Sequence, residues 1–349
     1  MTNSECLSIM SACGQAGRRE DEEERVFEIV FLGTAAVVPT PERCPSATLV
    51  RHGQSYYLVD CGEGTYQRLT QAKARGIADV RPGVNLRQVF LTHDHLDHLL
   101  GIGGLLFSTR MSHSRPRPRL SIYGGSTTVD RARMLATLIH SPETRDPGVD
   151  IEYFAVSRGV LIEDEEIIIS AFRSNHTARP CFGYTFEERP RRYFRAELAD
   201  RLGVPAGPLR ERLLAGESVN LPDGEVVHPD QVLSDPVPGA KVVISGDIAF
   251  TRGLATIAEG ADLLITEATF GADSAQLAES SGHMTAAQAG SIAALAHVRQ
   301  LCLTHIDQQY RGRESELLEE ARRVFPATIL PADLDTVIVE RAEQAGFRA

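Results

Sequence analysis

The sequence reads THDHLDH at residues 92–98, directly after the apolar run QVFL at residues 88–91. Four of its side chains are potential metal ligands, namely His93, His95, Asp97 and His98. Imidazole nitrogens and carboxylate oxygens are ligands that zinc commonly takes in proteins. A turn that follows a strand can direct neighbouring side chains toward two adjacent ion positions. We therefore interpret the stretch as part of a metal centre rather than as a polar surface turn.

Further ligand candidates stand at the ends of three other predicted strands. His176 follows EIIISAFRSN, Asp247 ends KVVISGD, and His305 ends QLCLTH. A lone residue at such a place is more typical of a turn or a cap, but their common placement favours metal binding. With the first cluster they form a set large enough for two ions, and a carboxylate such as Asp247 can bridge both. Two such ions can promote displacement at a phosphodiester, which predicts a hydrolase.

Strand-like and helix-like patterns alternate along the chain. Strands are predicted at residues 26–34, 46–52, 55–61, 88–93, 119–124, 149–156, 166–172, 181–187, 241–247, 262–268, 300–305 and 336–340. Helices are predicted at residues 65–75, 99–111, 128–140, 285–298 and 315–325. Many strands with interleaved helices predict an α/β protein with layered packing.

Composition excludes several classes of protein. The 349 residues contain no apolar run long enough for a membrane span, and the N-terminus does not resemble a signal peptide. Six cysteines without a CxxC pair do not indicate a disulfide framework, so we expect a reducing, cytoplasmic location. No GxGxxG or P-loop motif indicates a nucleotide cofactor. The net charge of −11 argues mildly against a non-specific nucleic-acid binder.

The motifs together resemble a known family. The HxHxDH motif with later His, Asp and His ligands resembles the metallo-β-lactamase fold of binuclear hydrolases. Within that fold the chain resembles the ribonuclease Z family, endonucleases that remove 3′ trailers from transfer-RNA precursors. The resemblance runs from about Phe27 to the C-terminus, through FLGT (31–34), DCGEGTYQRL (60–69), HDHLDH (93–98), NHTARPCFGY (175–184), LGVPAGPLRERLLAGE (202–217), PGAKVVISGD (238–247), TEATF (266–270) and LTHIDQQY (303–310). The Gly-Pro stretch at residues 202–217 is the part most specific to ribonuclease Z.

The resemblance implies an architecture and a ligand assignment. It implies a four-layer αβ/βα sandwich over residues 26–349, with residues 187–239 inserted as a projecting arm that grips the RNA. Residues 1–25 are interpreted as a disordered, charged tail. Two zinc ions are implied, one held by His93, His95 and His176, the other by Asp97, His98 and His305, with Asp247 bridging. Asp97 would also accept the proton of the attacking water. The family further implies a homodimer in which one subunit's arm serves the other's active site.

Two basic regions are candidates for contact with RNA. Residues 187–217 carry seven arginines and six carboxylates, a local charge of +1 in an acidic chain. The candidate substrate-binding residues in the arm are Arg189, Arg191, Arg192, Gly207 and Pro208. A second basic region, Phe107 to Gly125, contains Arg110, Arg115, Arg117 and Arg119 and no acid, and we expect it near the metal centre. The alternative interpretation of the arm is a solvated insertion, and that of the second region is a plain exposed loop.

One position departs from the family pattern. The family has His where this chain has Thr266, in a motif whose His is thought to protonate the leaving oxygen, and a threonine hydroxyl is too weak an acid for that role. His283 is retained in a second family motif and is the candidate proton donor. The departure keeps an alternative open, a divergent phosphodiesterase or esterase acting on small substrates such as cyclic nucleotides. A non-catalytic RNA-binding protein with the same fold is a further alternative.

Overall fold

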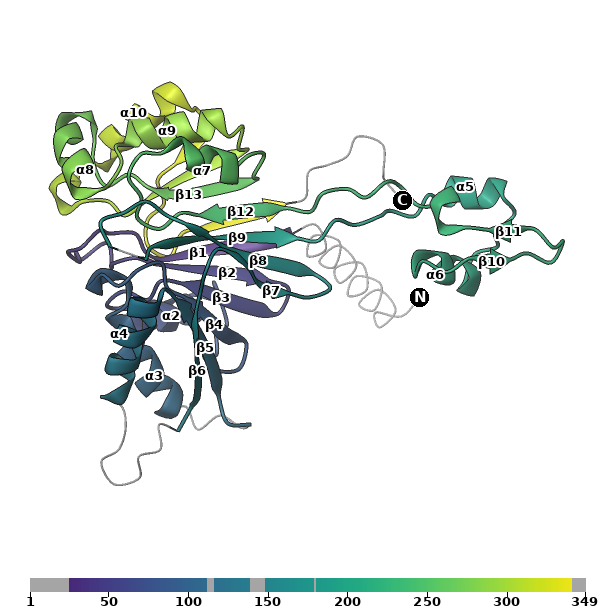
Figure 1. Cartoon of the computed structure of the whole chain (residues 1–349), viewed down its shortest axis with the longest axis horizontal. Helices are drawn as coiled ribbons and strands as arrows, with labels where there is room; N and C mark the ends of the chain where they lie inside the picture. The colour runs from purple at the N-terminus through teal and green to yellow at the C-terminus, as the bar shows by residue number, and fades with distance from the viewer. Residues whose placement is uncertain (1–24, 112–115, 139–147, 179, 341–349) are drawn as a thin grey trace, which may run out of the picture.

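The computed structural model describes residues 25–111, 116–138, 148–178 and 180–340 (Figure 1). The charged tail predicted at residues 1–25 lies outside these ranges, apart from Arg25. The body of the molecule contains two seven-stranded sheets that face each other (Figure 1). No helix in the described ranges is long and apolar enough to cross a membrane.

The first sheet has the strand order β16-β1-β2-β3-β4-β5-β6. Its strands are β1 (Arg25–Gly33), β2 (Ala47–His52), β3 (Ser55–Val59), β4 (Leu86–Phe90), β5 (Arg119–Gly124), β6 (Asp150–Ala155) and β16 (Thr336–Glu340). Strands β16, β1, β2 and β3 pair antiparallel, whereas β3, β4, β5 and β6 pair parallel. The carboxyl ends of the parallel strands therefore meet at one edge of this sheet.

The second sheet has the strand order β15-β14-β13-β12-β9-β8-β7. Its strands are β7 (Gly159–Glu163), β8 (Ile167–Arg173), β9 (Phe182–Glu188), β12 (Lys241–Ile244), β13 (Leu263–Glu267), β14 (Gln300–Thr304) and β15 (Thr328–Ile329). Strands β12 to β15 are parallel to one another, and β7, β8, β9 and β12 pair antiparallel in sequence. All predicted strands are present, whereas the short strands β7 and β15 were not predicted.

Aromatic side chains fill the space between the sheets. Phe90 of the first sheet contacts Phe186 and Tyr184 of the second, with ring centroids 5.9 and 5.2 Å apart. All three side chains are fully buried. Because burial of such a side chain stabilises a fold by roughly 1.5–3 kcal/mol, this cluster fixes the two sheets against each other.

Helices cover the outer face of each sheet, which confirms the predicted αβ/βα sandwich (Figure 1). The helices α2 (Thr65–Ala74), α3 (Gly101–Met111) and α4 (Ser126–Thr137) pack on the first sheet, and α7 (Arg252–Ile257), α8 (Ala275–Ser281), α9 (Ala286–Leu295) and α10 (Glu314–Val324) pack on the second. Helix α9 begins where the sequence predicts, because Thr285 forms a capping box with Gln288. The short helices α7 and α8 were not predicted.

After β9 ends at Glu188, the chain up to residue 239 leaves the body as two extended segments that run side by side (Figure 1). Backbone hydrogen bonds join Arg191 to Val237, and an isolated bridge joins Phe194 to Leu233. These segments, which we call the stalk, carry a small distal unit of α5 (Ala196–Arg201), α6 (Pro208–Leu214), β10 (Val219–Asn220) and β11 (Val226–Val227). The distal unit has a hydrophobic core of its own, formed by Ala199, Val204, Leu213, Val219, Leu221, Val227 and Val232.

Candidate metal centre

The structure brings all seven predicted metal ligands together at one edge of the two sheets. His93, His95, Asp97 and His98 follow β4, and the last two lie in the 3-10 turn η1 (Leu96–His98). His176, Asp247 and His305 follow β8, β12 and β14 in the second sheet. Neighbouring parallel strands end at the same edge, which places residues that are far apart in sequence around one point.

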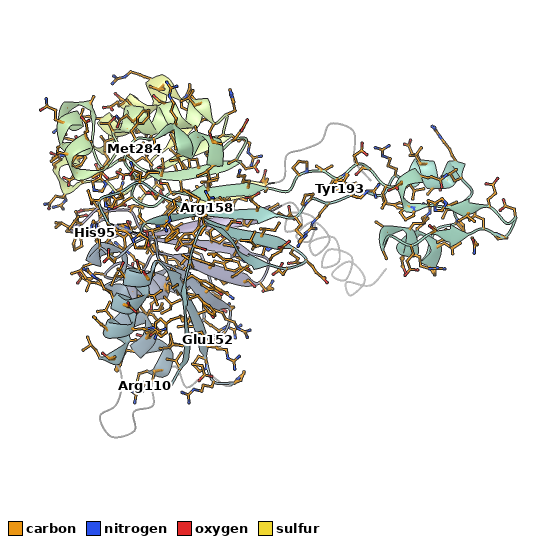
Figure 2. The ribbon with its side chains drawn as sticks, in the orientation of Figure 1. His95, Arg110, Glu152, Arg158, Tyr193 and Met284 are labelled. Carbon is orange, nitrogen blue, oxygen red and sulfur yellow. The ribbon has the colours of Figure 1, made fainter. Side chains whose placement is uncertain are left out.

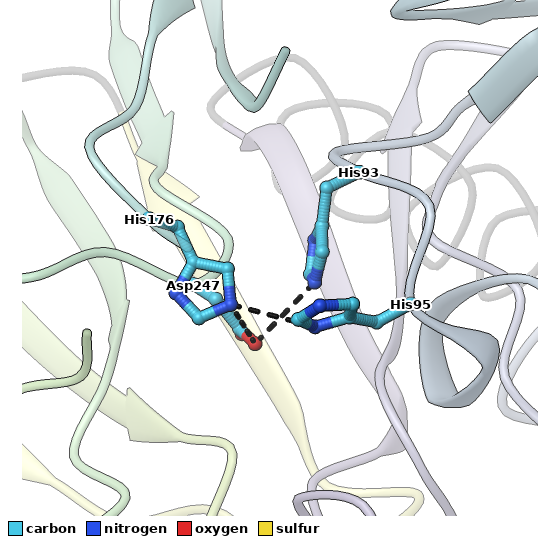
Figure 3. Close-up of side chains that lie close together, drawn as sticks. All are labelled: His93, His95, His176 and Asp247. Carbon is cyan, nitrogen blue, oxygen red and sulfur yellow. Dashed lines mark hydrogen bonds and ion pairs between the residues drawn. The ribbon is translucent and has the colours of Figure 1, made fainter. Parts of the chain in front are cut away.

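The first group of ligands combines three histidines with one carboxylate. His93, His95, His176 and Asp247 point toward one another, and each offers a ligand atom within 4.8 Å of the others (Figure 3). Nε2 of His176 lies 3.4 Å from Nδ1 of His95. Oδ2 of Asp247 lies 3.7 Å from Nε2 of His93 and 3.9 Å from Nε2 of His176.

The second group lies directly beside the first. Nε2 of His98 and Nε2 of His305 lie 3.3 and 3.4 Å from Oδ2 of Asp97. The same two nitrogens each lie 3.3 Å from Oδ2 of Asp247. A single oxygen of Asp247 therefore faces both groups, as a carboxylate that bridges two ions would.

The hydrogen bonding of the histidines fits a bound metal ion. Nε2 of His93 and Nε2 of His98 are buried and have no hydrogen-bond partner, and such atoms cost roughly 1–3 kcal/mol each when left unsatisfied. The Nδ1 atoms of two ligand histidines form hydrogen bonds that fix the orientation of their rings. Nδ1 of His98 donates to Asp60 (2.8 Å), and Nδ1 of His176 donates to the carbonyl of Gly282 (2.9 Å). Nδ1 of His305 lies 2.9 Å from Oγ1 of Thr269. Metal-binding histidines typically show this arrangement.

The electrostatics of the site keep both carboxylates ionised but act differently on the histidines. Burial would raise the pKa of Asp247, but the charges of His305 and His98 outweigh it and hold that pKa well below its usual range. Burial also opposes ionisation of Asp97, yet His98 and His305 lower its pKa. Burial and the neighbouring His98 lower the pKa of His93, which favours the neutral imidazole that binds metals. Burial lowers the pKa of His98, yet the charges of Asp247, Asp60 and Asp97 outweigh it and raise that pKa, so a metal ion would have to displace a proton there.

Asp60 belongs to the site although the sequence analysis did not select it. Its Oδ1 accepts the backbone N–H of Thr92 (2.8 Å), and its Oδ2 accepts Nδ1–H of His98. The residue has a φ of 59°, a left-handed conformation that is uncommon outside glycine. The signal that could have found it is the same as for the ligands, because Asp60 stands at the end of a predicted strand.

His283 lies against the ligand rings and is held by a carboxylate. Its Nδ1 lies 2.9 Å from Oε1 and 3.0 Å from Oε2 of Glu267. Its ring centroid lies 4.8 Å from that of His176 and 5.3 Å from that of His305. Burial lowers the pKa of His283, but the hydrogen bond and charge of Glu267 outweigh it and raise that pKa to about 9. With Asp247 and His305, His283 also forms a third group close enough to hold an ion.

Glu267 is itself fixed by the backbone around it. Its carboxylate accepts the N–H groups of Ile248 (2.6 Å) and Met284 (3.1 Å) and the hydroxyl of Thr269 (2.6 Å). The side chain is buried, so these bonds replace the water that it loses. Glu267 therefore sets both the position and the charge environment of the His283 ring.

Comparison with known proteins identifies the family. The model of the metallo-beta-lactamase superfamily matches residues 43–286. Ribonuclease Z from Bradyrhizobium diazoefficiens is 38% identical over 318 residues, which cover 90% of this chain and 100% of that protein. Ribonuclease Z from Natronomonas pharaonis is 40% identical over 314 residues, which cover 89% of this chain and 97% of that protein. This chain belongs to the ribonuclease Z family of the metallo-β-lactamase superfamily.

Solved structures show the same fold. Human tRNase Z, short form, superposes with a TM-score of 0.59 at 24% identity, covering 89% of this chain and 98% of that one. The metallo-beta-lactamase fold protein YhfI from Bacillus subtilis superposes with a TM-score of 0.61 at 21% identity, covering 90% and 100%. The resemblance stated from the motifs and the sandwich architecture are both confirmed.

The departure from the ribonuclease Z pattern at Thr266 lies inside the protein. Thr266 is buried in β13, and its hydroxyl lies 2.7 Å from that of Ser245, with which it shares a hydrogen bond. The next residue, Glu267, points to His283, and successive side chains of a strand alternate between its two faces. The Thr266 hydroxyl is thus engaged within the fold, while His283 remains beside the ligands.

The three candidate arm arginines, Arg189, Arg191 and Arg192, all have partners within the chain. Arg189 donates to the carbonyl of Asp164 (2.5 Å) and to Glu163 (2.6 Å), next to the turn between β7 and β8. Arg191 pairs with Glu188 at 2.9 Å, and Arg192 donates to Ser234 and Asp230, each at 2.7 Å. Gly207 and Pro208 are exposed at the start of α6, in the distal unit.

The second basic region lies away from the metal centre, which corrects the predicted placement. Arg117 and Arg119 stand at the amino-terminal end of β5 and pair with Asp150 at 2.8 and 3.9 Å. The ligands follow the carboxyl end of the parallel neighbour β4, so the two features occupy opposite ends of the sheet. Arg110 lies at the lower end of the view in Figure 2, far from His95. Arg115 lies outside the described residues.

Proposed function

We propose that this protein is a zinc-dependent endoribonuclease that removes 3′ trailers from precursor transfer RNA. The observation that carries the proposal is the single oxygen of Asp247 facing two ligand groups in a chain of the ribonuclease Z family. Such a site suits hydrolysis of a phosphodiester, because two ions can act on the attacking and the leaving oxygen at once.

The proposed assignment gives one ion to each ligand group. His93, His95 and His176 would hold the first ion, and Asp97, His98 and His305 the second, with Asp247 shared. Zinc fits the set of imidazoles and carboxylates, which are ligands of a borderline-soft ion. When bound, two such ions would polarise the attacking water and neutralise charge on the phosphate.

The chain's own residues would then move the protons. Asp97 is held as a carboxylate by His98 and His305, and it would accept the proton of the attacking water. His283, oriented by Glu267, would donate a proton to the leaving 3′-oxygen. The products would be a 3′-hydroxyl on the body of the transfer RNA and a 5′-phosphate on the trailer.

A groove gives RNA a route to Asp97. It is lined by Val37, Pro45, Leu96, Leu100 and Arg131 together with Glu63, His95 and Asp97. Val37, Leu96 and Leu100 are exposed there, and apolar side chains can pack against nucleobases. Asp97 therefore stands where a phosphodiester and its water could approach.

We propose that the arm binds the body of the transfer RNA and that the protein acts as a homodimer. In Figure 2 the metal-centre residue His95 lies on the side of the body opposite the stalk residue Tyr193. This separation supports an arm that serves the centre of a partner subunit. Gly207 and Pro208 are exposed for such contact, whereas RNA would have to displace existing partners to reach Arg189, Arg191 and Arg192.

The decisive experiment uses a transfer-RNA transcript with a 3′ extension. Purified protein loaded with zinc is incubated with the transcript, and both cleavage products are mapped at their new ends. We expect a single cut that leaves a 3′-hydroxyl and a 5′-phosphate. Binding of the RNA without cleavage, with zinc confirmed in the protein, would contradict the proposal and favour a non-catalytic RNA-binding protein.

The threonine at position 266 supports a second candidate function. A protein that lacks the family histidine there could instead hydrolyse small phosphodiesters or esters, such as cyclic nucleotides. Turnover of a cyclic nucleotide by the wild-type protein, combined with a Thr266→His variant that gains no RNA cleavage, would favour this alternative. The buried hydroxyl pair of Thr266 and Ser245 makes Thr266→Val the matched control for changes in packing.

A further inference from the structure

Asp333 joins segments that are distant in sequence next to the metal centre. It lies in the connection from β15 to β16, where the chain crosses from one sheet to the other, and its side chain is 2% exposed. Oδ1 accepts the backbone N–H (3.1 Å) and the hydroxyl (2.7 Å) of Thr34. Oδ2 accepts the backbone N–H of Cys44 (2.7 Å) and Nε–H of Arg68 (3.0 Å). The carboxylate thus clamps both ends of the loop between Thr34 and Cys44.

One end of this loop supports the backbone of His305. The carbonyl of Thr34 accepts the N–H of Ile306 at 3.0 Å, and the N–H of Ala36 donates to the carbonyl of Ile306 at 3.0 Å. Ile306 directly follows His305, whose φ of 57° lies in the left-handed region. A non-glycine residue keeps that conformation only where its surroundings hold it. The contacts from Thr34 and Ala36 supply that restraint.

The other end of the loop packs against the backbone of Asp97. Gly62 lies between them so tightly that an added Cβ would lie 2.8 Å from the carbonyl carbon of Pro45 and 2.4 Å from the carbonyl oxygen of Asp97. Pro45 directly follows Cys44, the residue that Asp333 binds. A shift of this end of the loop would therefore move the backbone that carries Asp97.

We propose that Asp333 is a positioning residue for the second ion, because it holds Asp97 and His305 at their distances from Asp247. The inference rests on the proposed two-ion centre. Ligands of the first group depend on other contacts, since His176 is held by Gly282 and His93 lies 3.0 Å from the hydroxyl of Thr92. Loss of the Asp333 clamp should therefore weaken binding of the second ion and leave binding of the first ion unchanged.

The test measures zinc binding directly. Metal-free protein is titrated with zinc in competition with a chromogenic chelator, which gives the stoichiometry and both dissociation constants. Asp333→Asn keeps the size of the side chain but replaces an acceptor oxygen with a donor group. Changes to residues behind metal ligands typically weaken binding 10–100-fold, so we expect the second ion to bind about tenfold more weakly.

A double-mutant comparison assigns the effect to one ion. His305→Ala removes a ligand of the second ion and leaves the first ion to be measured alone. Adding Asp333→Asn to this variant should leave the affinity of the remaining ion unchanged, because the two substitutions act on the same half of the site. Asp262→Asn is the matched control, since Asp262 accepts the N–H of Lys241 (2.9 Å) and faces Arg299 (3.6 Å) at the opposite end of β13.

The possible results separate the inference from the proposed function. The inference is overturned if Asp333→Asn weakens binding of both ions equally, or weakens binding of neither. Binding of two zinc ions by the wild-type protein would in that case still support the proposed two-ion centre. A single zinc ion in the wild-type protein overturns both. Should circular dichroism show that Asp333→Asn does not fold, Arg68→Gln removes one partner of the carboxylate more gently. A selective but smaller loss at the second ion is then expected, and an unselective loss again overturns the inference.

Discussion

The metal centre and the arm stalk use polar side chains in opposite ways. In the metal centre, Nε2 of His93 and Nε2 of His98 both face Oδ2 of Asp247 and lack hydrogen-bond partners. In the stalk, the guanidinium groups of Arg189 and Arg192 already donate to carboxylates and carbonyls of the chain. The ring nitrogens of the centre are thus available to bind a ligand, whereas the stalk donors already form hydrogen bonds within the chain. The free bonding capacity of a side chain, rather than its type, therefore indicates a binding site.

We expect the largest effect from substitution of a residue that has two roles in the metal centre. Asp97→Asn removes a charged ligand and the proposed proton acceptor together. We expect kcat/KM to fall by about 10⁴-fold, the upper range for one acid–base group, because metal binding is impaired as well. The fall should be equal for precursor transfer RNA and for bis(4-nitrophenyl) phosphate, since both need the same chemistry.

The neighbouring Asp94→Asn is the matched control for Asp97→Asn. Asp94 pairs with Arg131 at 3.2 Å and belongs to neither ligand group. Its substitution should change kcat/KM little for either substrate. Full activity of Asp97→Asn would show that Asp97 is not part of the proposed mechanism. It would also contradict the proposed difference between the metal centre and the stalk.

The second prediction separates the proton donor from the ligands. His283→Asn should lower kcat for precursor transfer RNA by about 10²–10³-fold, within the range for a general acid, while zinc content stays unchanged. Bis(4-nitrophenyl) phosphate should lose much less, because nitrophenolate leaves without a proton. His297→Asn is the control, since asparagine tolerates the φ of 51° at this exposed position. Equal losses on both substrates would mean that His283 holds metal instead.

The ligands could be predicted from sequence because they obey a local rule. His93, Asp247 and His305 each follow an apolar strand, and parallel strands end at a common edge whatever the details of packing. Asp60 obeys the same rule, so its omission was an error of selection. Asp333 does not, because its partners Thr34 and Arg68 are 299 and 265 residues away and no periodic pattern links them.

The second basic region shows how proximity along the chain misleads. Arg110 follows the HDHLDH motif closely in sequence, but α3 carries the chain away from the site. Its 11 residues span about 16 Å at 1.5 Å per residue. The pairing of Arg117 with Asp150 likewise depends on which strand lies beside β5, and the sequence alone did not give that order.

The third prediction tests whether the arm contributes only to RNA binding. Its distal unit has a separate core, and the backbone N–H of Arg195 lies 2.7 Å from the carbonyl of Val232. Replacing residues 196–231 with a short Gly-Ser turn should therefore leave the body folded. We expect kcat/KM for precursor transfer RNA to fall about 10²-fold through KM, since contacts to phosphates dominate RNA affinity. Hydrolysis of bis(4-nitrophenyl) phosphate should be unchanged, and an equal fall would show that the arm supports the fold.

The smallest expected effect compares two arginines of the arm. Arg201 is exposed and forms no hydrogen bond or ion pair with the part of the chain that the structure describes, whereas Arg189 is engaged with Glu163 and Asp164. Arg201→Ala should weaken RNA binding and lower the slope of log Kd against log salt by about 1, as loss of one phosphate contact does. Arg189→Ala should leave that slope unchanged and reduce stability by less than about 1 kcal/mol, because its ion pair is solvent exposed. The reverse result would mean that RNA displaces Glu163, and that free bonding capacity in the unbound protein is not a sufficient guide to its RNA contacts.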